Sequence, residues 1–524
     1  MLQLAHRRRL VLAVAVVAVS LVALPAGAVW AGDWPQWCGS DGKNLVSAEK
    51  GLPESFEPGR KQSQEGTIDL ATAQNVKWGV KLGDAFYSTP SVAGGKVYVG
   101  GLEGPDGTFT CFDAATGRRL WQWKAPPREA PRNIDGFSIG IATIPQQIGV
   151  CSSAAVEGDR VWFVSNRFDV VCLDTAGQPP GPKADQAREV WTYDMWKELG
   201  VFPCDASNGS PLLVGDLLYV TTCNGVDRNT FAEPAREKHR KLPAPDAPNL
   251  IVLDKRNGRL VATDAAPIVG RLLHGQWSSP SLGEVGGRKL VFYGGGDGVC
   301  YAFEALATVP EKPVRLKTVW SCDCIPAEYK AAAGDDWITH YCLGDKRVRG
   351  TLNKHDGTFV GMCEIIATPV FVDGRVYVAI GRDPAHGRGR GALHCIDAGG
   401  SGDITRTGIL WTYQGLDRTL STVSLSDGLV YILDVGGRLH CLDAATGKPC
   451  WVHDAACETW GSTLVADGKV YMPTLKGLWV LAAGRELKVL SRIALGGKVY
   501  ASPIVAHGTL YVATNSGWLW AVGK

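Results

Sequence analysis

One pattern of apolar and polar positions recurs along almost the whole chain. A small residue, often followed by proline, precedes an apolar stretch, a turn that contains glycine, and a second stretch with apolar residues at alternate positions. Alternation predicts a half-buried strand, and Gly-Gly, Asp-Gly or Gly-Asp between two such strands predicts a hairpin. The pattern occurs at 88–100, 152–166, 210–222, 278–295, 367–381, 421–434, 462–474 and 501–515.

A second pattern follows most copies of the first. It consists of an apolar-X-Asp strand end, a turn, and a further strand that carries tryptophan. The copies are 108–121, 439–451, 170–177 with Trp191, 393–400 with Trp411, and the degenerate 250–261 and 298–306. Asp-Ala-Ala-Thr-Gly suits the turn, because Asp and Thr bond local backbone groups and Gly adopts a left-handed conformation. The two patterns together predict four strands per repeat, which is one blade of a propeller.

The two ends of the chain complete each other. The eighth repeat stops at 518–524 and lacks a fourth strand, whereas a strand without a repeat, 75–82, carries Trp78 near the start. Pairing the two would close the ring and remove two exposed sheet edges. The sequence therefore predicts an all-β, eight-bladed β-propeller closed by an N-terminal strand in the last blade. A seven-bladed ring remains the alternative if 250–265 is not part of a blade.

The N-terminus has the order of a secretory signal peptide. A basic stretch at 6–9 precedes an apolar run at 10–24, which is short for a membrane span, and small residues follow at 25–31. Cleavage after Ala28 or Ala31 fits equally. We therefore expect a signal peptide at 1–31, a lead-in segment at 32–74 and the propeller at 75–524, exported to the periplasm or secreted.

Charge and composition narrow the range of partners. The 54 basic and 52 acidic residues give a net charge of +2, which offers no field for nucleic acid. No second long apolar stretch follows the leader, so we expect no membrane span in the mature chain.

The wording of the repeats, S-P-X-V-X-X-G-X-V-Y-V followed by C-L-D-A-A-T-G-K-X-X-W, resembles the PQQ-like β-propeller superfamily and covers nearly the whole mature chain. This superfamily includes quinoprotein alcohol and glucose dehydrogenases and the non-enzymatic scaffold lipoprotein of the outer-membrane-protein assembly machine. The segment 33–44 also resembles a lead-in of exported bacterial PQQ-like repeat proteins. These motifs are the strand and turn chemistry of a blade, so they imply the fold and leave the function open.

The dehydrogenase branch implies particular residues. It implies two adjacent cysteines that form a ring disulfide over the cofactor, and a Glu/Asn/Asp calcium set with an Asp base. No two cysteines are adjacent in this sequence, and no such calcium set aligns. We therefore expect no cofactor, no metal and no catalytic residue, and favour a non-enzymatic protein. A divergent PQQ-dependent oxidoreductase with PQQ and calcium is the alternative.

Eight of the fifteen cysteines fall into two groups. Cys111, Cys172, Cys395 and Cys441 occupy one repeat position, far apart around a ring, so we expect small buried core residues. Cys322, Cys324, Cys342 and Cys363 share one insertion with His340 and His355, where two local disulfides are preferred over free thiols or a zinc site. Other possible pairs are Cys204 with Cys223 and Cys450 with Cys457.

The longest insertions, 125–150, 223–249, 323–363 and 380–391, fall on one face of the expected ring. That face is formed by the loops that lead into each blade and the loops between its second and third strands; we term it the loop face, and the opposite one the turn face. Long loops on a rigid scaffold commonly carry function. The candidate residues of a central funnel there are Arg167, Asp205, Asp227, His274, Trp277, Arg382, Asp383, His386, Arg418, Asp434 and Trp460. We expect a binding or scaffolding module for a protein, a peptide or a polar small molecule.

Overall fold

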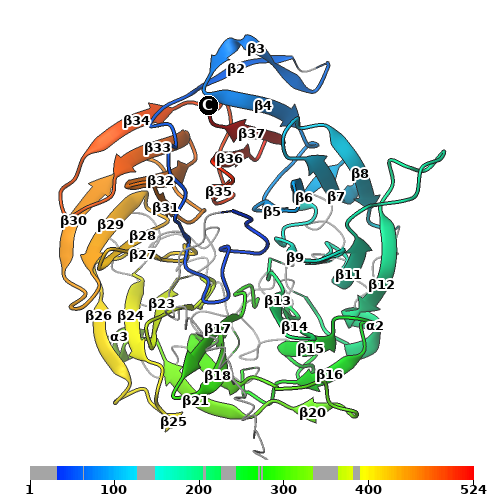
Figure 1. Ribbon diagram of the computed structural model, residues 1–524. Coiled ribbons are helices and arrows are strands. Elements are labelled where there is room, and N and C mark those ends of the chain that lie inside the picture. The colour runs from blue at the N-terminus through cyan, green and yellow to red at the C-terminus, as the bar shows by residue number, and fades with distance from the viewer. Residues whose placement is uncertain are drawn as a thin grey trace, which may run out of the picture.

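Eight sheets surround a central axis in the computed structural model (Figure 1). The described residues are 32–62, 64–126, 148–203, 208–225, 243–268, 272, 275–333, 364–381 and 390–524. Within them, no helix combines the length and apolar character needed to cross a membrane. The expected signal peptide lies outside the described part of the chain.

Each blade contains four antiparallel strands that run outward from the axis. The first four blades are β5 (Ser91–Ala93), β6 (Lys96–Glu103), β7 (Asp106–Asp113) and β8 (Arg119–Lys124); β9 (Ala155–Glu157), β10 (Arg160–Val164), β11 (Asp169–Asp174) and β12 (Arg188–Asp194); β13 (Leu212–Val214), β14 (Leu217–Thr221), β15 (Leu250–Asp254) and β16 (Leu260–Thr263); and β17 (Ser281–Val285), β18 (Arg288–Gly294), β19 (Val299–Glu304) and β21 (Thr318–Asp323).

The other four blades repeat this order. They are β22 (Val370–Val372), β23 (Arg375–Ile380), β24 (Ala392–Asp397) and β26 (Ile409–Tyr413); β27 (Ser424–Ser426), β28 (Leu429–Leu433), β29 (Arg438–Asp443) and β30 (Pro449–Asp454); β31 (Leu464–Ala466), β32 (Lys469–Thr474), β33 (Gly477–Ala482) and β34 (Val489–Ile493); and β35 (Ile504–Ala506), β36 (Thr509–Thr514), β37 (Trp518–Val522) and β4 (Val76–Lys81). The region 250–265 belongs to a complete blade, so the prediction of eight blades is confirmed.

The last blade joins the two ends of the chain, as predicted. β4 pairs antiparallel with β37, with Trp78 opposite Ala521. A hairpin of β2 (Glu57–Gln62) and β3 (Thr67–Gln74) extends the same sheet outward, beyond the ring of blades (Figure 1). The remaining elements are β1 (Val46–Ser47), β20 (Val314–Arg315), β25 (Gly402–Asp403), α2 (Met195–Leu199) and α3 (Ala327–Ala333).

The repeated cysteines fill the middle of their blades. Cys111 on β7, for example, lies opposite Tyr98 on β6 and Trp121 on β8. Cys111, Cys172, Cys395 and Cys441 are all buried free thiols, which confirms the expected core role. Burial raises the pKa of Cys172 and Cys441 to about 12 and that of Cys395 to about 11.

Tryptophans on the outermost strands join neighbouring blades. Each donates its indole N–H to a backbone carbonyl of the next blade at 2.9–3.1 Å. The tryptophans are Trp78, Trp121, Trp191, Trp320, Trp411 and Trp451. The glycine of the facing turn is required: Gly177 has a φ of 75°, and a Cβ on it would lie 2.5 Å from Trp121.

Serine and threonine side chains connect neighbouring blades near the axis. Each of these residues stands two positions before the innermost strand of its blade. The backbone N–H of one blade donates to the side-chain oxygen of the next at 2.9–3.1 Å, as from Thr422 to Ser462 and from Ser462 to Ser502. The eight equivalent residues, all buried, are Thr89, Ser153, Ser210, Ser279, Thr368, Thr422, Ser462 and Ser502. We call them the hydroxyl belt.

The lead-in follows the inner wall of the ring at the turn face, in the order of the blades (Figure 1, dark blue). Its backbone or Asn44 accepts the N–H of one equivalent residue in each of six innermost strands, at 2.8–3.0 Å. These residues are Val92, Val156, Leu282, Phe371, Leu425 and Val465. The segment then closes on itself, since Glu49 accepts the N–H of both Gly32 and Gly508. We call residues 32–49 the lead-in ring.

The lead-in ring holds a buried amine. Lys43 is 0% exposed and donates to Gln36 Oε1 at 2.6 Å. Burial disfavours its charged form and lowers its pKa to about 8. At the turn face, the lead-in ring therefore fills the end of the axis, and Lys43 is fully buried within it.

Candidate functional site

The opposite end of the axis, at the loop face, is surrounded by a second set of equivalent residues. Each stands two positions before a residue of the hydroxyl belt, where the chain enters a blade. The eight residues are Tyr87, Cys151, Asn208, Trp277, Ile366, Leu420, Trp460 and Tyr500. We call them the mouth ring. Trp277 is buried, and the other seven are half-buried or exposed, whereas the hydroxyl belt below them is buried throughout.

Three consecutive blades place aromatic side chains in the mouth ring. The rings of Tyr87 and Tyr500 stack with centroids 5.1 Å apart and an interplanar angle of 11°. Trp460 continues the row, with its centroid 4.5 Å from that of Tyr500. Burial, and then the neighbouring Tyr500, raise the pKa of Tyr87. We call these three residues the aromatic sector.

The aromatic sector leaves one hydrogen-bond donor without an acceptor. The indole N–H of Trp460 is buried and has no partner within the described residues, although the side chain as a whole is half-buried. On the open side, the ammonium of Lys498 lies 5.9 Å from the Tyr500 centroid. The sector thus combines π faces, one donor and one nearby cation.

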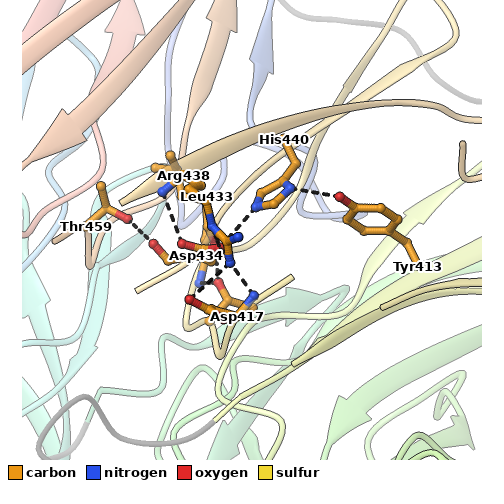
Figure 2. A network of polar contacts seen from close by, with 9 residues as sticks. Tyr413, Asp417, Leu433, Asp434, Arg438, His440 and Thr459 are labelled. Carbon is orange, nitrogen blue, oxygen red and sulfur yellow. Dashed lines mark hydrogen bonds and ion pairs between the residues drawn. The ribbon is translucent and has the colours of Figure 1, made fainter. Parts of the chain in front are cut away.

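A polar network lies on the same face, around the loop between β28 and β29, and extends to Thr459, the residue before Trp460. Figure 2 shows Asp434 at its centre, with its carboxylate accepting from Arg438 Nε at 2.9 Å and from the Asp417 backbone N–H at 3.2 Å. His440 Nε2 lies 3.0 Å from the same carboxylate, and His440 Nδ1 lies 3.0 Å from the Tyr413 hydroxyl. Thr459 donates to the Asp434 carbonyl at 2.6 Å.

The electrostatics of this network favour a fixed ion pair. Asp434 is 0% exposed; burial opposes its ionisation, but His440 and Arg438 outweigh burial and hold its pKa below the usual value. The Arg438 guanidinium also pairs with Asp417 at 3.0 Å. Asp434 is therefore an ionised carboxylate whose hydrogen bonds tie together loops of neighbouring blades.

The structure places five of the funnel candidates. Arg418 is 1% exposed and joins the Asp434 network, because its carbonyl accepts the N–H of Val435. Arg167 and Trp277 are also buried, and Trp460 belongs to the aromatic sector. Asp205, Asp227, His274, Arg382, Asp383 and His386 lie outside the described residues. The placed polar candidates are thus packed between loops, and the half-exposed groups around the axis are mainly aromatic and aliphatic.

Sequence reasoning missed Tyr87 and Tyr500, which belong to short loops. The signal was present, because both precede the small residue that starts a repeat, as Trp460 does. Aligning the repeats by their Ser/Thr position would have put all three in one column.

The candidate disulfide cysteines are free thiols wherever they are described. Cys450 and Cys457 are free, so that expected pair is not formed. Cys322 and Cys324 are free and buried, and Cys223 is free; their proposed partners Cys342, Cys363 and Cys204 lie outside the described residues. Cys322 lies in a blade opposite Cys300 on β19, which is also a free thiol.

A calcium-quinone centre does not fit the residues in view. In the described ranges, no group of three or more His, Cys, Asp or Glu side chains could hold a metal ion. Adjacent cysteines are missing from the whole sequence.

Comparison with solved structures supports the architecture. BamB of Moraxella catarrhalis is 14% identical, with a TM-score of 0.52 over 85% of this chain and 98% of the BamB chain. A europium-containing methanol dehydrogenase is 12% identical, with a TM-score of 0.53 over 92% of this chain and 89% of the dehydrogenase chain. At such identities the likeness shows the fold alone.

The sequence comparisons agree with the repeats. No curated protein matches the sequence significantly. The family model for outer membrane protein assembly factor BamB matches residues 67–266 and 390–490, more than half of the chain. The chain therefore belongs to this family of PQQ-like β-propellers.

Proposed function

We propose that this protein is an exported binding or scaffolding propeller that holds an extended polypeptide at the loop face, around its axis. The observation that carries the proposal is the difference between the two ends of the axis. At the turn face, six innermost strands are bonded by the lead-in ring. At the loop face, seven of the eight mouth-ring residues keep exposed surface.

Other features support a polypeptide ligand. The family description concerns assembly of outer membrane proteins, which are polypeptides in transit. Aromatic groups dominate energetic centres of protein interfaces, and three of them are aligned in the mouth ring. The Asp434 network ties neighbouring loops together, and loops that are ordered before binding lower its entropic cost. The leader at 1–31 supports export.

Two matched double charge reversals, one on each face, test whether the polypeptide binds at the loop face. Lys476 and Lys498 are exposed on the loop face, and Arg288 and Lys289 are exposed on the turn face. The probe is a fluorescein-labelled, 20-residue extended peptide of alternating aromatic and polar residues that includes Asp, with binding followed by anisotropy.

We expect Lys476→Glu with Lys498→Glu to weaken binding about tenfold or more, which corresponds to about 1.4 kcal/mol. Arg288→Glu with Lys289→Glu should leave the affinity unchanged. No binding by the parent protein, or loss only in the turn-face variant, would contradict the proposal. Dye reduction that depends on added PQQ and calcium would instead favour the oxidoreductase.

A further inference from the structure

The aromatic sector has a geometry that the proposed function alone does not require. Trp460, Tyr500 and Tyr87 occupy the mouth-ring position of three consecutive blades and form one continuous row. Each remains half-buried. Each ring stands two residues before the buried hydroxyl belt of its own blade.

We infer that the aromatic sector is a recognition site for an aromatic side chain on the bound polypeptide, with a neighbouring peptide carbonyl accepting the Trp460 indole N–H. This inference rests on the proposed function and names the feature of the ligand that is recognised. The row of rings supplies π faces for an additional ring in stacked or edge-to-face contact.

The unpaired donor points to a polypeptide as the source of that ring. A buried N–H without an acceptor costs free energy. The Trp460 indole N–H has no acceptor within the described residues. A peptide carbonyl bound beside the half-buried indole would supply the missing acceptor. An extended peptide offers such a carbonyl within one residue of each side chain.

Charge around the sector narrows the ligand further. Lys498 is exposed and lies 5.9 Å from the Tyr500 centroid. Lys498 favours an acidic residue beside the bound ring at the Tyr500 end of the row, whereas the exposed acidic residues Asp84 and Glu458 lie in the segments of Tyr87 and Trp460. The ligand is therefore an aromatic residue, with an acidic neighbour favoured on the Tyr500 side.

The test uses three peptides that differ at one central residue: phenylalanine, cyclohexylalanine or alanine. Cyclohexylalanine keeps the apolar bulk of phenylalanine and removes its π system. Affinities are measured by anisotropy for the full-length protein and for two variants. Tyr500→Leu removes the middle ring of the row, and Trp460→Phe keeps a ring but removes the indole N–H.

The parent protein should bind the phenylalanine peptide about tenfold more tightly than the alanine peptide, with cyclohexylalanine between them. Tyr500→Leu should abolish the preference for phenylalanine over cyclohexylalanine. Trp460→Phe should weaken all three peptides by a similar factor, because the lost bond is to the backbone. Leu410→Ala, at an exposed residue of β26 on the outer rim, is the control and should change nothing.

Failures of the two proposals are distinguishable. If all three peptides bind the parent equally, the aromatic sector is not the recognition site, although the loop-face proposal stands. If no peptide binds, both fail; tight binding of free p-cresol or PQQ without any peptide binding also overturns the inference. Should Tyr500→Leu not fold, a peptide with benzoylphenylalanine at the central position provides the readout. Photo-crosslinks must then fall on segments 84–90, 457–463 or 496–502, and crosslinks elsewhere contradict the inference.

Discussion

The two ends of the axis are built from equivalent positions of the same eight repeats, yet they have opposite characters. At the turn face, the lead-in ring satisfies the backbone of the innermost strands and buries Cys38, Lys43 and Leu45 completely. At the loop face, equivalent residues such as Tyr87 and Tyr500 keep exposed surface. The comparison indicates that the turn-face end stabilises the fold, whereas the loop-face end keeps exposed surface, to which we assign the proposed ligand.

Deleting residues 32–47 should have the largest effect. It removes the acceptors of six backbone N–H groups, at roughly 1 kcal/mol or more each, together with part of the core. We expect a loss of several kcal/mol, a large fraction of the stability of an ordinary domain, seen as a much lower melting temperature. Adding the 32–47 peptide should recover part of the loss. An unchanged melting curve would contradict the claim that the lead-in ring at the turn face stabilises the fold.

Lys43→Met should change the pH dependence of stability. The folded pKa of about 8 lies below the ordinary 10.5, so the unfolded chain binds more protons between these values and the parent gains stability as pH rises from 8 to 10.5. The difference corresponds to about 3 kcal/mol, so the methionine variant should be the more stable protein at pH 7 and should lack this gain. Denaturant titrations at pH 7 and 10.5 measure it, with exposed Lys77→Met as the control. A parent that loses stability relative to the variant over this interval contradicts the packing of Lys43.

Ser462→Ala tests the hydroxyl belt that lies between the two ends. It leaves the buried N–H of Thr422 without its acceptor, at a cost of about 2 kcal/mol. Ser462→Thr keeps a hydroxyl and should lose less. Denaturant titrations measure the free energy of unfolding of both variants. Equal values for the alanine and threonine variants would contradict a stabilising role of the hydroxyl belt.

Tyr500→Ala should cost the least stability, about 1 kcal/mol, because the ring is half-buried and its contacts are mainly the two aromatic neighbours. Its circular dichroism spectrum should match that of the parent. A loss comparable to the lead-in deletion would mean that the loop-face end is also structural.

The sequence was informative wherever the signal was repeated. The strand that carries Trp78 belongs to no repeat, and the eighth repeat lacks only its fourth strand, so the two were predicted to pair. β4 pairs with β37 as expected. The buried state of Cys111 and its equivalents followed from their common repeat position. Both predictions rest on local sequence patterns that recur from blade to blade.

Features that depend on non-repeated, long-range contacts could not be predicted. The lead-in has no period, and its partners, such as Val92 and Val465, lie from about 60 to 420 residues away. The sequence predicted Arg418 and Asp434 as residues of an open funnel, but tertiary packing buries both. Of the aromatic sector only Trp460 was predicted, because Tyr87 and Tyr500 belong to short loops without an insertion that marks them.

Hydrogen–deuterium exchange with and without saturating phenylalanine peptide tests the central claim most directly. The account predicts slower exchange in segments 84–90, 457–463 and 496–502, around the aromatic sector, with no change in the lead-in ring or in the turn at Gly286 and Gly287. Protection confined to residues 32–49 or to the turn-face hairpins would contradict it.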